Sequence, residues 1–386
     1  MTERSSFQLS GEQELLRDSV HTLAAERIAP RAAEIDRTAE FPQDVRELLA
    51  SQDIFALPFP VAHGGLDAGL LSLCLAIEEI SRACATSGLM LAVQALGALP
   101  LILAGTPEQQ ARWLPDLAAG RTLVAFALTE AEAGSDPSAI RTRAVRDGDE
   151  YVITGGKRFI SHGSIADVVA VFAVTDPEGQ RHRRLSCLLV EQGMPGFSVS
   201  RLEHKMGIRG SPTAELVFDG VRVPADHLVG AEGDGFDIAM RTFERSRPGI
   251  AAQAVGIAQG ALDVAATYAT ERVQFGRPIG EFQMVGAMLA DMDAATESAR
   301  AVLYRACAEI DSGSPAASRW AALCKLVAGD AAMRVTTDAV QVLGGYGYVS
   351  DYPVERMMRD AKITQLYEGT QQIQRLVVAR HLLGRS

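Results

Sequence analysis

The residues best suited to chemistry lie near the C-terminal end of the chain, in the stretch QLYEGTQQIQ. Glu368 stands there between the ring of Tyr367 and Gly369, and apolar residues at helical spacing follow from Ile373 onward. A carboxylate at this place can be a first-turn charge that favours a helix N-terminus. It can also be a base that stays dry until it meets a substrate. The pattern alone leaves both interpretations open.

A second acid, Glu244, competes with Glu368 for the role of base. Glu244 lies beside Arg241, Arg245 and Arg247, and nearby cations keep a carboxylate ionised, so it suits a structural or substrate-positioning role. Glu368 has apolar neighbours, and loss of solvent makes a carboxylate more basic. The charge of Arg247 and a helix start act in the opposite direction on Glu368. The sequence does not decide which effect is larger.

Three further polar stretches interrupt apolar sequence: LTEAEAGSD (128–136), FISHG (159–163) and ERVQFGRPIGEFQ (271–283). Small residues in the first would let backbone N–H groups approach an anion or a ring edge. The second places an aromatic ring and a hydroxyl at a strand end, and arginines in the third can meet phosphates. Taken singly, each also fits a turn or a solvated charge.

Several common kinds of site are not expected. The chain has no GxGxxG after a strand, no GxxxxGK[ST], no HExxH and no GxSxG motif. Its seven histidines are dispersed without an i,i+4 pair, so we expect no metal site. Dinucleotide-fold, P-loop, zinc-enzyme and serine-hydrolase chemistry therefore lack support.

Composition indicates a soluble cytoplasmic protein of several domains. The 386 residues are 47% hydrophobic and 22% charged, with a net charge of −11, which disfavours nucleic acid or an anionic membrane as a partner. The N-terminus lacks the pattern of a secretory signal, and we expect no apolar run that approaches the ~20 residues of a membrane span. Five scattered cysteines are expected to be reduced and buried.

Periodicity changes twice along the chain, which predicts an α+β fold in three sections. Residues 1–122 read as helices, with a capping box at Ser10 and another start at Thr106. Six short β-branched segments in 123–232 predict a small antiparallel barrel or sandwich, with a hairpin turn at Gly155–Gly156. Residues 233–386 predict a C-terminal four-helix bundle. A stripe of Met284, Met288, Leu289 and Met292 is expected in its core.

The order of the polar stretches and the α, β, α layout resemble the acyl-CoA dehydrogenase family, most closely its short- and branched-chain members. The resemblance covers nearly the whole chain, and KMGIRGSPTAELVFDGVRVP (205–224), ERVQFGRPIGEFQ and DAKITQLYEGTQQIQRLVVARHLL carry it. It implies FAD as cofactor and α,β-dehydrogenation of a saturated acyl thioester to the trans-2-enoyl thioester. It also implies a homotetramer that passes electrons to an electron-transfer flavoprotein.

The resemblance implies two groups of cofactor-binding residues. Within one chain, the FAD-lining residues are Phe126, Leu128, Thr129, Gly134, Ser135, Phe159, Ile160 and Ser161, with the Ser161 hydroxyl near flavin N5. Residues that would serve a partner subunit's FAD, or cover it from the bundle side, are Arg272, Phe275, Gln283, Gln341, Val342, Gly344 and Gly345. Thr370 and Gln372 would hold the diphosphate at a helix N-terminus.

The resemblance also assigns the chemistry. Glu368 would take the α-proton while hydride leaves the β-carbon for flavin N5, and the Glu368 N–H would hold the thioester oxygen with a ribityl hydroxyl. The implied substrate contacts are Ser135, Glu244, Arg247, Tyr367, Glu368 and Gly369. Some members carry the base at the position of Ser246, with a small residue at 368. Here the acid is at 368.

This chain departs from the family pattern near the flavin. Phe159, Ser161 and His162 stand where Trp, Thr and Asn are usual. Ala131–Glu132 replaces a Pro-Gly pair, so the family pattern does not determine the conformation of this loop. Three alternatives remain beside the dehydrogenase: a flavin oxidase, a biosynthetic dehydrogenase acting on a carrier-protein thioester, and an inactive structural paralogue. The retained Glu368 and Arg272 argue against the last. Acyl-chain length depends on side chains in 88–96.

Overall fold

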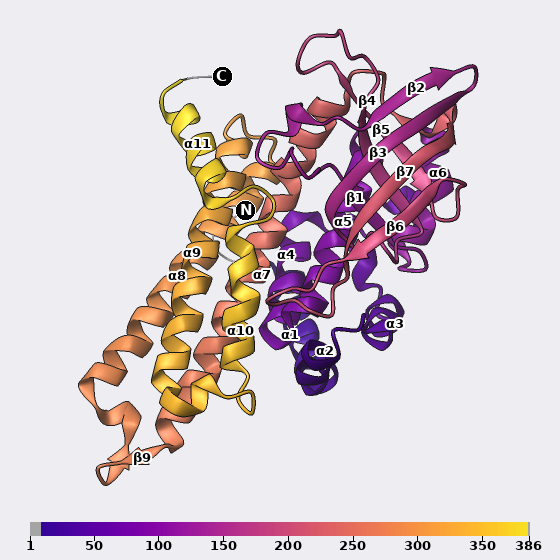
Figure 1. The fold of residues 1–386 in the computed structure, drawn as a ribbon. Helices are drawn as coiled ribbons and strands as arrows, with labels where there is room; N and C mark the ends of the chain where they lie inside the picture. The colour runs from indigo at the N-terminus through magenta and orange to yellow at the C-terminus, as the bar shows by residue number, and fades with distance from the viewer. Residues whose placement is uncertain (1–8, 385–386) are drawn as a thin grey trace.

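The computed structural model describes residues 9–384, which form helices, then a sheet, then long helices. The sheet lies on one side of the molecule and the long C-terminal helices on the other (Figure 1). The helices of the first section are α1 (Gly11–Leu23), α2 (Ala32–Thr38), α3 (Gln43–Ser51), α4 (Gly69–Ala83), α5 (Ala85–Ala104) and α6 (Pro107–Ala118). The predicted capping boxes begin α1 and α6, at Ser10 and Thr106.

The helix α5 corrects the expectation that no apolar run reaches membrane length. It has 20 residues and a mean hydropathy of 1.9, and one more helix, α7 (Gly235–Glu271), also passes this test of length and composition. In α5 72% of the apolar window is buried inside the fold, and in α7 78%, as expected for core helices. Gln94 in α5 donates to the carbonyls of Leu117 and Thr122, both at 2.9 Å, and accepts from the Val124 N–H. This helix therefore anchors the start of the sheet.

All six predicted strand segments contain strands, in a sheet of order β6-β7-β3-β2-β4-β5-β8 with β1 paired to β4. Most pairs are antiparallel, whereas β1 runs parallel to β4 and β2 touches β4 in parallel at one position. The strand β2 was missed because only Ala144 among its residues is buried. The strands are β1 (Val124–Ala127), β2 (Arg143–Asp147), β3 (Glu150–Ser161), β4 (Val168–Val174), β5 (Leu185–Glu191), β6 (Phe197–Leu202), β7 (Thr213–Pro224) and β8 (Leu228–Val229).

The predicted hairpin at Gly155–Gly156 is wrong, because β3 runs straight through both glycines. Gly155 has φ +146°, and a Cβ there would lie 2.7 Å from the Cα of Thr142. The residue is glycine because the backbone of Thr142 approaches it closely. In a sequence, such a glycine cannot be distinguished from a glycine in a turn. The real hairpin joins β2 to β3 through Gly148 and Asp149, with Gly148 at φ +63°.

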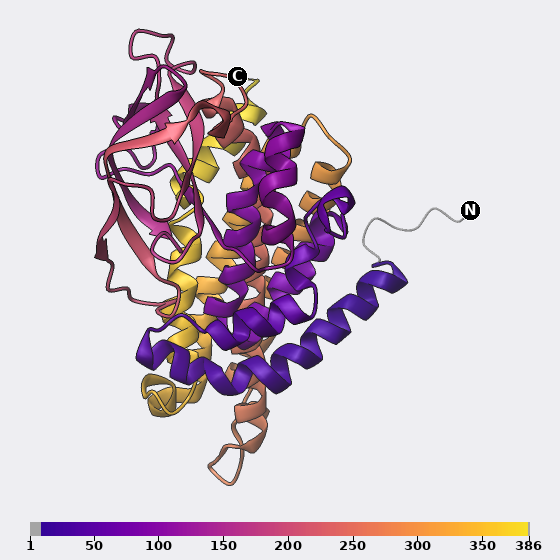
Figure 2. The ribbon, with the colours of Figure 1, turned by 90° about the vertical axis from the view of Figure 1, so that its right-hand side faces the viewer.

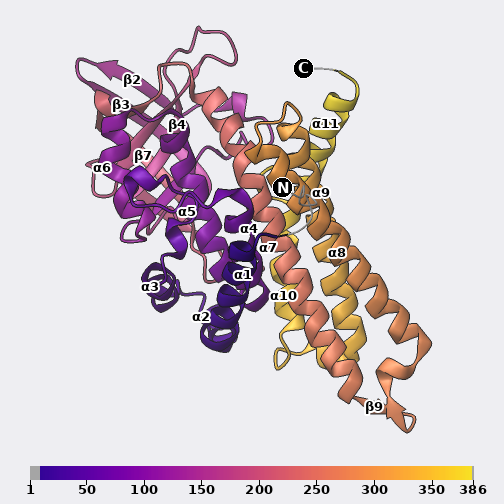
Figure 3. The ribbon, with the colours of Figure 1, turned by 180° about the vertical axis from the view of Figure 1, so that it is seen from behind.

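The C-terminal section is a helical bundle, as predicted. Its long helices α7, α8 and α9 run side by side, and α10 and α11 lie against α9 (Figures 1 and 3). Besides α7, its elements are β9 (Val273–Gln274), β10 (Arg277–Pro278), α8 (Gln283–Asp311), α9 (Ala317–Leu343), α10 (Val354–Ala361) and α11 (Gln371–Leu382). In α8, Met292 is buried and Met288 and Leu289 are half-buried, but Met284 is 79% exposed. The predicted core stripe therefore extends one turn too far toward the start of α8, because that end of the helix projects beyond its neighbours.

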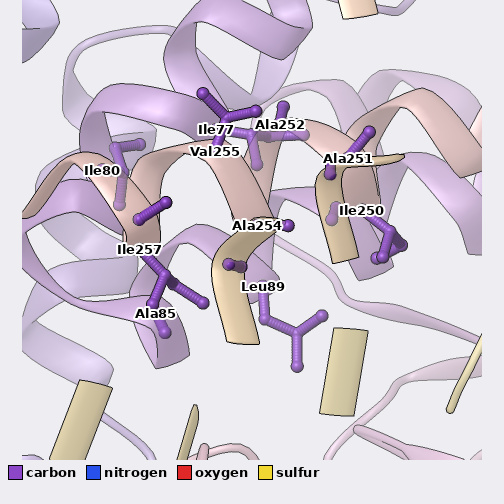
Figure 4. Packing of buried hydrophobic residues seen from close by; sticks show 14 of the residues in the cluster. Ile77, Ile80, Ala85, Leu89, Ile250, Ala251, Ala252, Ala254, Val255 and Ile257 are labelled. Atoms are coloured by element: carbon purple, nitrogen blue, oxygen red, sulfur yellow. The ribbon is translucent and has the colours of Figure 1, made fainter. Parts of the chain in front are cut away.

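One hydrophobic core joins the first and last sections. Ile77 and Ile80 from α4 and Leu89 from α5 meet Val255 and Ile257 from α7 (Figure 4). The helices α4 and α5 lie between the sheet and the bundle (Figures 2 and 3). All five cysteines are unpaired and buried, as expected of core residues. The helices α4 and α5 are therefore rigidly connected to the bundle.

Arg359 in α10 connects three segments that are distant in sequence. Its guanidinium donates to both carboxylate oxygens of Asp36 in α2, at 3.0 and 2.6 Å, and to Glu355, at 2.7 Å. It also donates to the carbonyl of Met206, at 3.0 Å. Removing one partner of a largely buried ion pair leaves the other charge without compensation. Arg359 should therefore matter more for stability than an exposed arginine.

We predict that Arg359→Met lowers the free energy of unfolding by about 2–4 kcal/mol. The matched control is Arg222→Met, because Arg222 also pairs with two acids, Asp147 and Glu150, but on the exposed surface. That change should cost less than about 1 kcal/mol. Denaturant unfolding monitored by circular dichroism checks the difference, and equal losses for the two variants would contradict it.

Candidate active site

A cavity of about 960 Å³ opens where the three sections meet. The helices α5, α7 and α11, the loop after β1 and the end of β3 form its walls. Leu89, Ala92, Val93 and Leu96 from α5 line one apolar wall, as expected for the segment 88–96. Serine and threonine side chains line the opposite loops, so the cavity has one apolar and one polar side.

The cavity unites twelve of the residues predicted for the site. Those that line it are Phe126, Leu128, Thr129, Gly134, Ser135, Phe159, Ile160, Ser161, Arg247, Tyr367, Glu368 and Gly369. Those that do not are Glu244, Arg272, Phe275, Gln283, Gln341, Val342, Gly344, Gly345, Thr370 and Gln372. Thr370 is the N-cap of α11, directly after Gly369, and Gln372 lies in the first turn of that helix.

Most of the residues outside the cavity gather at the far end of the bundle. They lie between the end of α7 and the start of α8, and at the end of α9 and in the 3-10 helix that follows it, and Phe275 is 93% exposed. Arg272 lies over the ring of Tyr346, 5.2 Å from its centroid, at a second cavity of about 540 Å³. These residues do not contribute to the Glu368 cavity of their own chain.

Glu368 lies on a turn in the left-handed region, two residues before the N-cap of α11. Its φ is +56° and that of Gly369 is +87°. A non-glycine residue in this conformation costs about 1–3 kcal/mol and persists only where its surroundings hold it. Glu368 is therefore not a first-turn charge of the helix.

Three side chains hold the two carbonyls of this turn. Gln374 in α11 donates to the carbonyls of both Glu368 and Gly369, at 2.9 Å each. Arg247 in α7 donates to the Glu368 carbonyl at 3.3 Å, and Lys325 in α9 donates to that of Gly369 at 2.7 Å. In residues 9–384, the N–H of Glu368 has no backbone carbonyl as acceptor. The turn is thus fixed through its acceptors, and one donor on it stays available.

Two opposing effects act on the Glu368 carboxyl group. Burial raises its pKa above the ordinary value. The Ser246 hydroxyl, which donates to Glu368 Oε2 at 2.8 Å, and the charges of Arg247 and Lys325 lower the pKa. The net direction is upward, which answers the question that the sequence left open. A carboxylate with a raised pKa is a better base.

Tyr367, the neighbour of Glu368, is fixed from the other side of the turn. Its hydroxyl bonds to Oε1 of Gln253 in α7, and Gln253 donates to the carbonyl of Ala85 at 3.0 Å. Burial raises the pKa of the Tyr367 hydroxyl well above its ordinary value. Tyr367 therefore stays neutral and provides a rigid wall of the cavity.

A buried ion pair shapes the loop that carries Thr129 and Ser135. Lys157 Nζ lies 2.8 Å from Glu130 Oε1 and donates to the Leu128 carbonyl at 3.0 Å. Glu130 accepts from the N–H groups of Arg141 and Thr142, at 2.7 and 3.0 Å. Burial lowers the pKa of Lys157 to about 8. The ion pair attaches the loop to β3.

The replacement of Pro-Gly by Ala131–Glu132 leaves this loop with a tight turn. The backbones of Glu130 and Ala133 pair across it, with N–H to carbonyl distances of 3.1 and 3.2 Å. The Glu132 carboxylate lies 2.6 Å from Arg141, and both side chains are exposed. The additional charge therefore faces the surface and not the cavity.

The end of β3 presents an exposed aromatic ring to the cavity. Phe159 has φ +59° and a side chain that is 57% exposed. Three residues on, His162 also has φ +59°, but its ring is buried against Phe41 and neither ring nitrogen has a hydrogen-bond partner in the described structure. Burial lowers the pKa of His162 to about 3, so the ring is neutral.

Of the residues that hold Glu368 and its neighbours in place, Arg247 was predicted, whereas Lys325, Gln374 and Gln253 were not. Gln374 lies in the stretch QLYEGTQQIQ but was given no role, and Lys325 and Gln253 lie outside the stretches that were singled out. The available signal was a single lysine among Ala321, Cys324 and Ala328 on a buried helix face. Residues of the apolar wall on α7 were also missed, namely Phe236, Met240 and Phe243.

Comparison with known proteins identifies the family. Models of the acyl-CoA dehydrogenase N-terminal, middle and C-terminal domains match residues 10–121, 125–221 and 233–383. The chain is 49% identical to cyclohex-1-ene-1-carbonyl-CoA dehydrogenase of Geobacter metallireducens over 376 residues, 97% of this chain and 99% of that protein.

Solved structures agree with the sequence comparison. Butyryl-CoA dehydrogenase from Megasphaera elsdenii superimposes with a TM-score of 0.95 at 42% identity, over 98% of this chain and 99% of that one. A chain from a structure described as the electron transferring flavoprotein of Acidaminococcus fermentans gives a TM-score of 0.96 at 44% identity, with the same coverage. Together with the cavity around Glu368, these matches show that the chain belongs to the acyl-CoA dehydrogenase family of oxidoreductases.

Proposed function

We propose that the protein removes the α- and β-hydrogens of a saturated acyl-CoA thioester and forms the trans-2-enoyl thioester, with Glu368 as the base. The observation that carries the proposal is the Glu368 carboxyl group itself. It faces the cavity from a turn held by donors from three helices, and burial raises its pKa.

The polar side of the cavity suits FAD. Phe159 exposes a large apolar ring to it, and covering that ring with a flat ring system would be favourable. A Cβ added at Gly134 would meet no atom within 4 Å, so the loop beside it leaves space. The residues that would hold the flavin are Phe126, Leu128, Thr129, Gly134, Ser135, Phe159, Ile160 and Ser161. When bound, FAD supplies at N5 the acceptor for the hydride that leaves the β-carbon.

The protein's own groups would perform the proton chemistry. Glu368 takes the α-proton, and a raised pKa brings its basicity closer to what this weak carbon acid needs. The N–H of Glu368, which has no backbone acceptor among residues 9–384, can donate to the thioester oxygen and stabilise the developing negative charge. The apolar wall from α5 and α7 excludes water from the base.

The substrate we propose is a coenzyme A thioester with a short, branched or alicyclic acyl chain. The support is the apolar wall of Leu89, Ala92, Val93 and Leu96, together with relatives named for butyryl-CoA and cyclohex-1-ene-1-carbonyl-CoA. A carrier-protein thioester is the alternative, and turnover of free acyl-CoA distinguishes the two.

We also propose a homotetramer in the cytoplasm that passes electrons to an electron-transfer flavoprotein. The exposed Phe275 and the position of Arg272, far from the Glu368 cavity of the same chain, support a role at the FAD of another subunit. Gln283, Gln341, Val342, Gly344 and Gly345 would join them there, with Thr370 and Gln372 at the diphosphate. Five unpaired cysteines fit a reducing compartment.

Glu368→Gln should retain FAD and acyl-CoA binding but slow flavin reduction by at least ~10²–10⁴-fold, because it removes the positioned base. Anaerobic stopped-flow bleaching with butyryl-, isobutyryl- and cyclohexanecarbonyl-CoA measures this. The matched control is Glu244→Gln, since Glu244 does not line the cavity. It should change KM more than the reduction rate. Near wild-type bleaching by Glu368→Gln would refute the proposed base.

Flavin reduction should speed up with rising pH as Glu368 loses its proton, at a pH above the ordinary carboxyl pKa. Ser246→Ala removes a hydrogen bond that lowers this pKa, so the rising limb of the profile should move to higher pH by about one unit. Thr242→Val is the control, because the Thr242 hydroxyl is buried without a hydrogen-bond partner in the described structure. A shift to lower pH in Ser246→Ala would contradict the assignment.

With product bound, the reduced enzyme should react slowly with air and rapidly with an electron-transfer flavoprotein or a dye. The outward orientation of Glu132 leaves the cavity side of its loop without an added charge, so nothing there favours oxygen over the family's usual acceptor. Peroxide detection in air, beside a dye-reduction assay, measures the partition. Rapid, stoichiometric peroxide would instead support the flavin-oxidase alternative.

A further inference from the structure

We propose that Lys325 is a positioning residue for Glu368: from the interior of α9, its ammonium holds the Gly369 carbonyl and so keeps the Glu368 carboxylate turned into the cavity. This inference rests on the proposed role of Glu368 as the base. Neither the family resemblance nor the sequence pattern assigned Lys325 to the site.

Lys325 is fully buried, and its acceptors belong to the turn and the start of α11. Its Nζ lies 2.7 Å from the Gly369 carbonyl oxygen and 3.3 Å from Gln371 Oε1. Its neighbours in the helix, Ala321, Cys324 and Ala328, are buried core residues. Methionine would fill the same volume without a charge, whereas a buried ammonium is strongly unfavourable unless it is paired and hydrogen-bonded. A lysine at this place therefore serves its acceptors and not the packing of the core.

The Gly369 carbonyl matters because peptide units are planar. Fixing the carbonyl oxygens of Glu368 and Gly369 fixes the two peptide planes that meet at the Gly369 Cα. The first of these planes also contains the Glu368 Cα, so holding it restricts the directions in which the Glu368 side chain can leave the backbone. Gln374 holds both oxygens, and Lys325 adds the shortest of these contacts. Glu368 is in a disfavoured left-handed conformation, so a weaker hold would let the turn relax.

The surrounding bonds attach the start of α11 to the stretch of α9 that follows Lys325. Gln371 donates to the Leu326 carbonyl at 2.7 Å and to Asp330 Oδ1 at 2.9 Å. The start of α11 is therefore docked on α9, with Lys325 reaching past Gln371 to the residue before the N-cap. The turn has a rigid template beneath it, and Lys325 is the part of that template that donates to the Gly369 carbonyl.

The charged and titratable groups around Lys325 are Glu368, Arg247, Asp330 and Cys324. Burial lowers the pKa of Lys325 to about 7, Arg247 acts in the same direction, and Glu368 and Asp330 oppose them. Burial thus disfavours the charged form of this amine, as is common for functional groups and unusual for a core position. In either protonation state Lys325 has an N–H to donate to Gly369.

Lys325→Met tests the proposal, with Lys362→Met as the matched control. Lys362 bonds to Gln365 at 2.8 Å in the segment that leads to the same turn, but it contacts neither the Glu368 nor the Gly369 carbonyl. The holoenzyme of each variant is mixed anaerobically with whichever of butyryl-, isobutyryl- or cyclohexanecarbonyl-CoA bleaches the wild type fastest. Lys325→Met should keep its FAD, bind the thioester within about threefold of wild type, and reduce the flavin about 10²-fold more slowly, the size of effect expected for a base displaced by about 1 Å.

Reduction by Lys325→Met within twofold of wild type, or a lowered melting temperature with an unchanged reduction rate, overturns the proposal. Should Lys325→Met fail to fold, Gln374→Met removes the other donor to the same carbonyl and must show the same selective loss of rate. Glu368→Gln is measured beside them: if it still reduces flavin, the proposed base is wrong, whereas an inactive Glu368→Gln with a fully active Lys325→Met refutes the role of Lys325 alone.

Discussion

The candidate active site depends on one local constraint, the left-handed turn at Glu368 and Gly369. Such a turn is unfavourable for glutamate, so the fold must hold it from outside. Donors reach its carbonyls from α7, α9 and α11, which are three separate helices of the bundle. The bundle is therefore more than a support for the site. Its helices must be packed in register with one another before the carboxylate can point into the cavity.

The rest of the fold transmits this requirement to the first two sections. The helix α7 carries Arg247 and Ser246 at the turn, and the same helix shares its core with α4 and with α5, which provides an apolar wall of the cavity. Its glycines allow the close approach, because a Cβ at Gly256 would lie 2.2 Å from the Glu78 carbonyl oxygen. The loop that would face the flavin depends in turn on the Lys157–Glu130 pair. The turn that carries Glu368, the apolar wall from α5 and the loop of Thr129 and Ser135 are thus positioned by one connected interior.

Patterns local in sequence predicted the structure well, and contacts distant in sequence escaped prediction. The capping box at Ser10 and the six β-branched segments depend on residues within a few positions of one another, and all were found. Gly155 and Lys325 were misread or missed because their reasons lie elsewhere, in the Thr142 backbone and the Gly369 carbonyl. Twelve of the residues around the cavity came from family resemblance, which carries such distant contacts implicitly. Lys325 and Gln253, which lie outside the quoted motifs, required the structure.

The contact between Ser246 and Glu368 explains why only one of the two positions can be acidic. Their side-chain oxygens lie 2.8 Å apart, so a carboxylate at 246 would stand against the one at 368. Two like charges at that distance cannot both ionise, and one pKa would rise steeply. With serine there, the neighbour donates a hydrogen bond and moderates the effect of burial on Glu368. Without that donor, the carboxyl group would keep its proton to higher pH, and a smaller fraction of the protein would carry the basic carboxylate. With more donors, the pKa would fall and the carboxylate would be a weak base. The serine keeps the pKa of Glu368 between these limits, so that the carboxyl group can be deprotonated and still be a stronger base than an exposed carboxylate.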